Sequence, residues 1–99
     1  SSLSGGNQQR VVLAKWLSIN PKVMILNGPT VGVDVGSKRE ILEIIRDRAQ
    51  AGMAFLLVSD DIPELVQICH KVLVIRHGKI SKEFNDKQIS ESAIYKELN

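Results

Sequence analysis

The sequence predicts an α/β fold built on a parallel sheet. Two short apolar runs, KVMIL at 22–26 and MAFLLVS at 53–59, show almost no alternation of apolar and polar residues. Such runs are typical of strands whose two faces are both buried. A helical pattern lies between them, and strands joined through a helix pair in parallel by a right-handed crossover. We therefore expect helix, strand, helix, strand, helix, hairpin and helix, in that order, with helices on both faces of the sheet.

Two amphipathic helices accompany the strands. In the first, RVVLAKWLSI at 10–19, four apolar residues recur on one helical face, and Asn20-Pro21 ends the helix because the residue before a proline avoids the helical region. These four residues are Val12, Leu13, Trp16 and Leu17. The second, KREILEIIRDRAQAG at 38–52, follows the loop GPTVGVDVGS and ends at Gly52. Its predicted inward face carries Ile41, Ile44 and Ile45.

The second half of the chain predicts a short helix, a hairpin and a last helix. In DDIPEL, Asp61 and Glu64 have the spacing of a capping box, so a helix should run from there to about His70. KVLVIRHGKISKEF at 71–84 reads as a hairpin that turns near His77-Gly78. The last helix, ESAIYKEL, is expected to pack through Ile94, Tyr95 and Leu98.

Length and composition exclude several classes of protein. Ninety-nine residues with 43% apolar content form one small domain at most, or a piece of a larger one. A net charge of +2 without a basic cluster argues against nucleic acid as a partner. The single Cys69 cannot form an internal disulfide. The longest apolar run, at 53–58, falls short of the ~20 residues of a membrane helix. Any membrane role must therefore involve a partner.

Two motifs carry chemistry. Ser4-Gly5-Gly6 directly precedes a helix, and glycines there allow a close backbone approach to an anion beside exposed N–H groups and the positive helix end. A plain flexible helix start is the alternative for these three residues alone. The second motif is VMILNGPT at 23–30, in which a strand delivers Asn27-Gly28 to a glycine-bearing loop. Its alternative is a hairpin turn at Asn-Gly, which Pro29 in the returning strand disfavours.

The motifs resemble those of ATP-binding cassette (ABC) ATPases, in the family's order and spacing. LSGGNQQR resembles the signature motif in its sugar-importer form, and VMILNGPT is similar to the Walker B strand, which normally ends Asp-Glu-Pro-Thr. TVGVDVGSK resembles the D-loop, with Asp34 at the D-loop aspartate. LLVSDDIPEL resembles the switch segment, where Asp60 replaces the usual histidine. The resemblance covers residues 1–99, but these correspond only to the later part of a nucleotide-binding domain of about 200 residues or more.

The resemblance implies a P-loop NTPase fold of the ABC ATPase type that is incomplete and ends in a hairpin and a helix. Residues 1–99 would be the C-terminal portion of one nucleotide-binding domain, from the signature motif to the last helix, with the GxxxxGK[ST] phosphate loop (Walker A) absent. The form of the signature favours the second of two cassettes fused in one chain. In such a pair the signature residues of one cassette close over nucleotide held by the other. These would be Ser4, Gly5, Gly6 and Gln8.

The same resemblance implies cofactors, partners and location. The complete transporter would use ATP and Mg²⁺, whereas none is expected to bind the isolated fragment. The partners would be a second ABC cassette and transmembrane permease subunits, and indirectly a periplasmic or extracellular sugar-binding protein. The chain would lie peripherally at the cytoplasmic face of the plasma (inner) membrane. Because the family fold places the phosphate-loop strand between 53–59 and 71–76, its absence leaves two apolar edges, and we expect self-association, strand exchange or a distorted sheet.

The departures from the family pattern weaken catalysis in the chain's own site. Asn27 removes a full charge from beside a divalent ion. Gly28 supplies no carboxylate to polarise water, and such general-base help is worth a factor of roughly 10²–10⁴. A carboxylate on Asp60 about 4 Å from a γ-phosphate would be repelled by roughly 1–4 kcal/mol, although Asp60 could simply help to start a helix. We therefore expect no catalytic residue and, since His70 and His77 have no partner spacing, no metal site.

Two alternatives stay open at this point. The first is a regulatory pseudo-ATPase, or an interaction module, that has no transport role. The second is an ABC-type ATPase of DNA repair, which composition supports only weakly. In the importer interpretation the local site is hydrolysis-deficient while the signature motif still contributes to a composite ATP site in trans.

Overall fold

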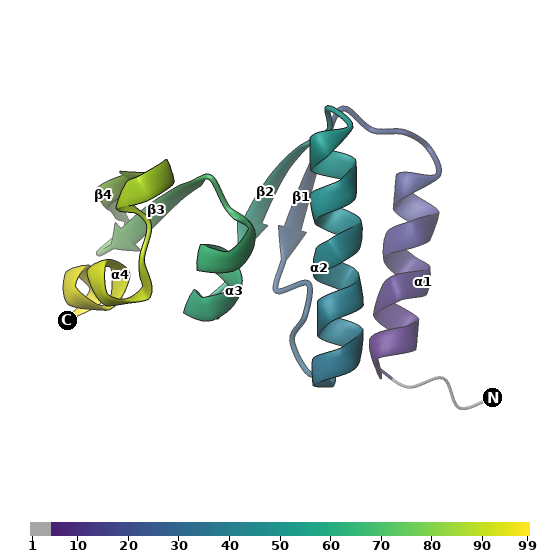
Figure 1. Cartoon of the computed structure of the whole chain (residues 1–99), viewed down its shortest axis with the longest axis horizontal. Helices are drawn as coiled ribbons and strands as arrows, with labels where there is room; N and C mark the ends of the chain where they lie inside the picture. Colours follow the sequence, from purple (N-terminus) through teal and green to yellow (C-terminus); the bar gives the residue numbers. More distant parts are fainter. Residues whose placement is uncertain (1–4) are drawn as a thin grey trace. The chain divides into compact units, whose positions relative to one another are not determined.

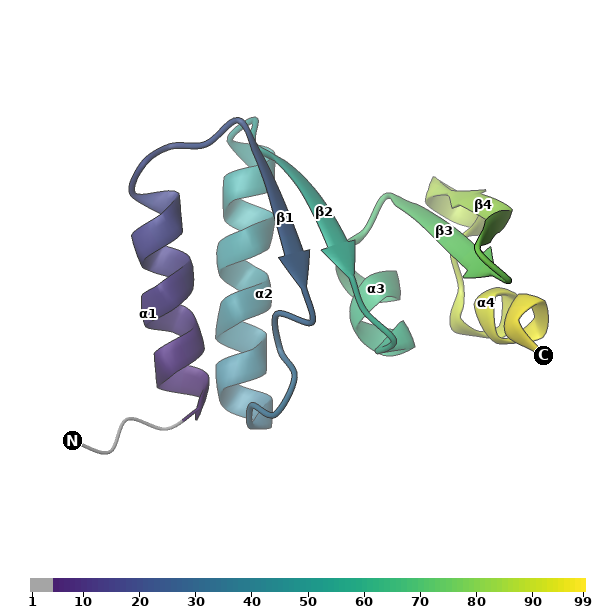
Figure 2. The same cartoon turned by 180° about the vertical axis from the view of Figure 1, so that it is seen from behind.

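The structure is a computed structural model that describes the backbone of residues 5–99 and the side chains of residues 8–99. The chain divides into two compact units, one ending at Ser59 and one spanning Asp60–Asn99. Each unit has its own two-stranded sheet, and no ladder joins the two sheets among the described residues. Figures 1 and 2 show the elements of each unit from opposite sides. Within residues 5–99, no helix combines the length and the apolar character needed to cross a bilayer.

The first unit has the predicted order of elements. Helix α1 (Gly5–Leu17) leads to strand β1 (Val23–Asn27), and helix α2 (Val35–Gln50) leads to strand β2 (Ala54–Val58). The strands are parallel, with Val23 opposite Ala54 and Asn27 opposite Val58. This pairing confirms the predicted crossover and shows that the hairpin alternative for Asn27-Gly28 is wrong. Helices α1 and α2 lie side by side along the sheet in both views (Figures 1 and 2).

Apolar residues at helical spacing form the core of the first unit. Leu13 and Leu17 are one turn apart on α1, and Ile41 and Ile45 are one turn apart on α2, so each pair lies on one face of its helix. All four side chains are buried, and Ile41 is only 1% exposed. Full burial of such a side chain is worth about 1.5–3 kcal/mol. The core therefore holds helix α1 against helix α2.

The prediction that both strands are buried on both faces is wrong for this unit. Burial alternates along β1 and β2, and the outward side chains are half-exposed or more, with Ile25 at 67% and Leu56 at 52%. Helix α2 packs against one face of the sheet and α1 packs against α2, and an apolar run alone does not specify what covers the other face. On α1, Val12 and Trp16 were expected on the inward face, but both are exposed.

Helix α2 ends through its backbone, as Gly52 predicts. The cap residue is Ala51, and Gly52 follows it with φ of +107°, a conformation that favours glycine. The Met53 N–H donates to the Arg48 carbonyl at 3.1 Å, and the Gly52 N–H donates to the Ala49 carbonyl at 3.0 Å. These two bonds form a Schellman motif, which satisfies carbonyls that the helix end would otherwise leave without donors.

The second unit also follows the predicted order. Its elements are α3 (Ile62–Ile68), β3 (Lys71–Arg76), β4 (Lys79–Asn85), the 3₁₀ helix η1 (Asp86–Gln88) and α4 (Glu91–Leu98). Strands β3 and β4 are antiparallel, and the hairpin turns through His77 and Gly78, whose φ angles are +53° and +75°. Positive φ at both positions is the mark of a type I′ turn, which matches strand twist.

The core of the second unit lies between the hairpin and its helices. The buried apolar side chains come from α3, β3, β4 and α4, and they are Ile62, Leu65, Val72, Val74, Phe84 and Ile94. The expectation that Tyr95 and Leu98 pack beside Ile94 is wrong, since both are more than 40% exposed. A helix of eight residues offers one narrow inward stripe, and Ile94 occupies it.

Candidate functional site

Asn27 and Gly28 lie at the carboxyl end of β1, the edge where open parallel sheets place their ligand sites. Asn27 is the last residue of the strand and its side chain is exposed. The Gly28 N–H donates to the Val58 carbonyl of β2 at 2.7 Å, so the backbone remains attached to the sheet one residue beyond the strand. The position therefore offers an amide side chain and a firmly held backbone, but no carboxylate.

Gly28 has a backbone conformation that disfavours any side chain. Its φ is +58°, in the left-handed region. A Cβ built at Gly28 would lie 2.9 Å from the Cγ2 atom of Val31, closer than carbon atoms normally approach. The family's glutamate is thus not simply missing here, because the local backbone leaves no unstrained place for it.

Of the residues expected to form the signature motif, Gly5, Gly6 and Gln8 lie at the start of α1. Gly5 and Gly6 form its first turn, and Gln8, in the next turn, is exposed. The expected role of Ser4 lies outside the described residues. The first N–H groups of any helix lack partners within it, and glycines expose them fully, so this end of a 13-residue helix has donors suited to a phosphate.

Asp34, expected at the D-loop, is the N-cap of α2. Its carboxylate accepts from the Ser37 N–H at 2.8 Å and from the Ser37 hydroxyl at 3.2 Å. These two hydrogen bonds, the backbone one foremost, hold the pKa of Asp34 below its usual value. The residue has an observed structural role, and its D-loop role stays a prediction.

Asp60, the expected switch residue, begins the second unit and is exposed. The neighbouring Asp61 is the residue that caps α3, because its carboxylate accepts from the Glu64 N–H at 3.1 Å. The cap that the sequence predicted for this segment is therefore confirmed at Asp61. The role of Asp60 at phosphate stays a prediction.

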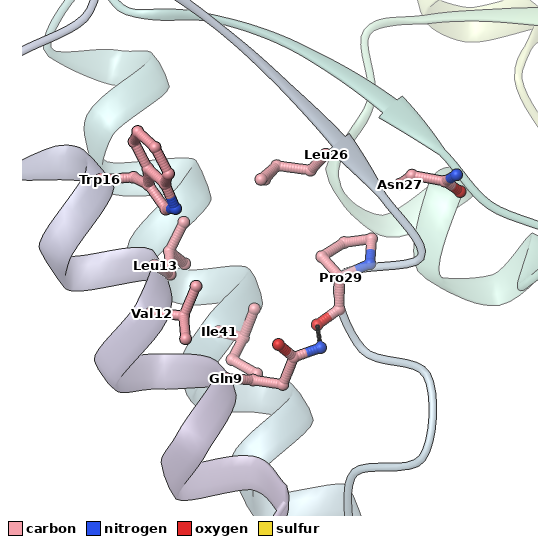
Figure 3. A pocket seen from close by; sticks show the side chains of 8 residues that line it. All are labelled: Gln9, Val12, Leu13, Trp16, Leu26, Asn27, Pro29 and Ile41. Carbon is pink, nitrogen blue, oxygen red and sulfur yellow. Dashed lines mark hydrogen bonds between the residues drawn. The ribbon is translucent and has the colours of Figure 1, made fainter.

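Two contacts in the first unit were not foreseen from the sequence. The Gln9 side-chain amide donates from Nε2 to the Pro29 carbonyl at 3.2 Å, and the Arg10 guanidinium pairs with the Glu40 carboxylate of α2. Figure 3 shows Gln9 reaching from α1 toward Pro29, just after Asn27. Gln9 precedes the buried Leu13 by one turn, and this spacing is the signal that could have placed it on the inward face.

A mostly apolar hollow of about 120 Å³ lies beside this contact, between α1 and the end of β1 (Figure 3). It is lined by Gln9, Val12, Leu13, Trp16, Leu26, Asn27, Pro29 and Ile41. Apart from the amides of Gln9 and Asn27, no side chain at its wall is polar enough to hold an ion.

The pair Asn27-Gly28 does not fit a magnesium ion well. Magnesium at nucleotide sites is usually held through one or two carboxylates together with phosphate oxygens, and this pair supplies no carboxylate. Asn27 offers only a neutral amide oxygen at the position where the family has an aspartate. Nucleophilic thiol chemistry is also disfavoured, because burial and then the Glu64 carboxylate raise the pKa of the half-buried Cys69.

Comparisons with known proteins agree on one family. The chain is 47% identical over 94 residues to a ribose import ATP-binding protein of Rhizobium meliloti (strain 1021), and 50% identical over 94 residues to one of Ruegeria sp. (strain TM1040). Each match covers 95% of this chain and 18% of the relative. This chain thus spans less than a fifth of the length of these curated relatives. No protein-family model matches it.

Solved structures show the same fold. An ATP-binding cassette of an ABC transporter superposes with a TM-score of 0.83 at 22% identity, covering 98% of this chain and 40% of that chain. A dimeric cassette in a post-hydrolysis state, bound to ADP and Pi, gives a TM-score of 0.74 at 26% identity over 84% of this chain and 36% of that one. The fold is therefore that of part of an ABC cassette.

Proposed function

Because this chain is a homologue of part of the ATP-binding proteins of ABC sugar importers, we propose that it is the C-terminal portion of one nucleotide-binding domain of such an importer. It couples ATP use to the uptake of a sugar, and its signature motif completes an ATP site on a second cassette. Its own nucleotide site is deficient in hydrolysis. It works at the cytoplasmic face of the membrane, against transmembrane permease subunits.

The observation that carries the proposal is the pair Asn27-Gly28 at the carboxyl end of β1. An amide there binds Mg²⁺ less strongly than a carboxylate would, because it brings no charge to the ion. Gly28, in a left-handed conformation, stands where the family has the glutamate that polarises the attacking water. Both departures lie at the same site, and neither lies in α1.

The start of α1 supports the other half of the proposal. Gly5 and Gly6 are in the first turn of the helix, where backbone N–H groups and the helix dipole favour a bound phosphate. ATP would supply that phosphate, held on the partner cassette. The residues of this chain contribute oriented donors to it, with Ser4 adding a hydroxyl.

The relatives support the choice of substrate class. Both of those compared above are named as ribose import ATP-binding proteins. A sugar is therefore the proposed cargo of the complete transporter. In this proposal a substrate-binding protein outside the membrane and the permease select that sugar.

The test is steady-state phosphate release by the complete two-cassette protein. Ser4→Arg should abolish release, because a phosphate donor is lost and a bulky charge is inserted between the cassettes. Asn27→Ala, the matched change in the local site, should leave the rate within about twofold, since that site already lacks its water-polarising carboxylate. If Ser4→Arg left the rate unchanged, the regulatory pseudo-ATPase, which the same Asn27-Gly28 pair also favours, would become the better interpretation.

A further inference from the structure

Two side-chain contacts tie the start of α1 to the segment that follows β1. The first is the hydrogen bond from Gln9 Nε2 to the Pro29 carbonyl, 3.2 Å long and partly buried. The second is the ion pair of Arg10 with Glu40, which joins α1 to α2 across 30 positions of sequence. Both begin within two turns of the signature glycines.

These two contacts fix the rotation of α1 about its axis, which the apolar core alone leaves adjustable. Leu13 and Leu17 bury one face of α1, but apolar contacts are non-directional and tolerate small rotations of a helix. A hydrogen bond to a carbonyl weakens steeply with angle, so it defines the rotation of the helix about its axis. Gln9 and Arg10 are adjacent, but one contacts the loop after β1 and the other contacts α2. The rotation of α1 is therefore constrained by two elements.

We propose that Gln9 and Arg10 are positioning residues that set the orientation of the signature glycines relative to the chain's own site. The Gln9 acceptor, Pro29, directly follows Asn27-Gly28, and the Arg10 partner, Glu40, is on the helix that Asp34 caps. A displacement of the loop after β1 therefore reaches the first turn of α1 through one hydrogen bond. This inference rests on the proposed function, in which those glycines meet a phosphate on the partner cassette.

An exposed ion pair alone would be weak support, since such pairs contribute little to stability. The Gln9 contact does not share that weakness, because its donor is partly buried beside the apolar hollow described above (Figure 3). Leucine at this position fills similar space against Val12 and Leu13 while removing the donor. Gln9→Leu thus isolates the hydrogen bond from packing.

The test measures amide hydrogen exchange by NMR in the 99-residue chain, at Val11 and Val12, one to two turns inside α1. Gln9→Leu should accelerate exchange there by roughly threefold to tenfold, the equivalent of one net hydrogen bond. Arg10→Glu or Glu40→Arg alone should accelerate it by roughly twofold to fivefold, and the double reversal should restore the original rate. The controls are Gln50→Leu and Glu43→Arg, at exposed positions of α2, which should change nothing.

Unchanged exchange at Val11 and Val12 in Gln9→Leu and in both single reversals would overturn the inference. Failure of the double reversal to restore the rate would overturn the part played by Arg10. In the complete protein, Gln9→Leu should lower kcat for phosphate release while KM stays within about twofold, because the positioning affects chemistry more than binding. Hydrogen exchange needs no nucleotide. If Ser4→Arg left phosphate release unchanged, the proposed function would be refuted, while the exchange rates at Val11 and Val12 would still test the contacts of Gln9 and Arg10.

Discussion

Gly28 decides how far the local site could be repaired. Restoring the family's two carboxylates requires Asn27→Asp and Gly28→Glu, and the first change meets no obstacle because Asn27 is exposed at a strand end. The second places a side chain at φ of +58° and a Cβ 2.9 Å from Val31. Asn27→Asp should therefore strengthen magnesium binding in the complete protein, whereas Gly28→Glu adds strain together with its carboxylate.

A matched pair of glycines tests that strain. Gly28→Ala should destabilise the 99-residue chain by about 1–2 kcal/mol, the cost of a left-handed residue with a Cβ. Gly36→Ala should be neutral or stabilise it by up to about 1 kcal/mol, because Gly36 is in α2 without positive φ and its added Cβ meets only an ordinary contact at 3.5 Å. Urea unfolding followed by circular dichroism measures both, and equal effects would show that the Gly28 backbone is not strained.

Asp34 gives a second prediction at the residue scale, through pH. Its folded-state pKa is lowered by the Ser37 hydrogen bonds, so its contribution to stability is present above the unfolded aspartate pKa of about 3.9. That contribution is lost as the pH falls through the lower, folded value. Asp34→Ala should reduce the melting temperature at neutral pH, and the difference from the unmodified chain should shrink below about pH 4. A difference that stays constant down to pH 2 would contradict this role of the carboxylate.

At the scale of elements, the sequence predicts what local chemistry determines. The end of α2 follows from Gly52, the hairpin turn from His77-Gly78 and the start of α3 from Asp61, since each depends on a few neighbouring residues. The covering of β1 and β2 could not be predicted in the same way. Whether a helix covers Ile25 and Leu56 depends on which face of the sheet α2 packs against, and α2 leaves their face exposed.

The exposed face of the β1–β2 sheet leads to a prediction about association. Its outward side chains, Val23, Ile25, Leu56 and Val58, are apolar, uncharged and at least half-exposed. An uncharged apolar surface of this kind favours contact with another copy. We expect the 99-residue chain to self-associate as its concentration rises, and the apolar sheet edges favour the same outcome.

Single lysine substitutions locate that contact. Ile25→Lys or Leu56→Lys should weaken association by roughly tenfold to hundredfold, the effect of losing one buried apolar side chain of about 1.5–3 kcal/mol. Val35→Lys is the control, because Val35 is also apolar and more than half-exposed but lies at the start of α2. Sedimentation velocity over a concentration series provides the measurement. Association that Val35→Lys weakens as much as Ile25→Lys would place the contact elsewhere.

At the scale of the whole molecule, the order of motifs carried more information than any one of them. Ser4-Gly5-Gly6 alone fits a flexible helix start, and Asn27-Gly28 alone fits a hairpin. The resemblance to ABC ATPases depends on the order in which these motifs occur along the chain, with Asp34 and Asp60 following. The Gln9–Pro29 contact could not be predicted, because it joins elements 20 positions apart whose packing the sequence does not specify.

In the proposed transporter, one site hydrolyses ATP and the site of this chain does not. Rapid-quench measurement of the first turnover tests it directly, because burst amplitude counts active sites independently of the steady-state rate. We expect the unmodified two-cassette protein to form a single phosphate per molecule in the burst, Asn27→Ala to leave that amplitude unchanged and Ser4→Arg to remove it. A burst of twice that amplitude, halved by Asn27→Ala, would show that the site at Asn27-Gly28 hydrolyses ATP and that the proposed division between the two sites is wrong.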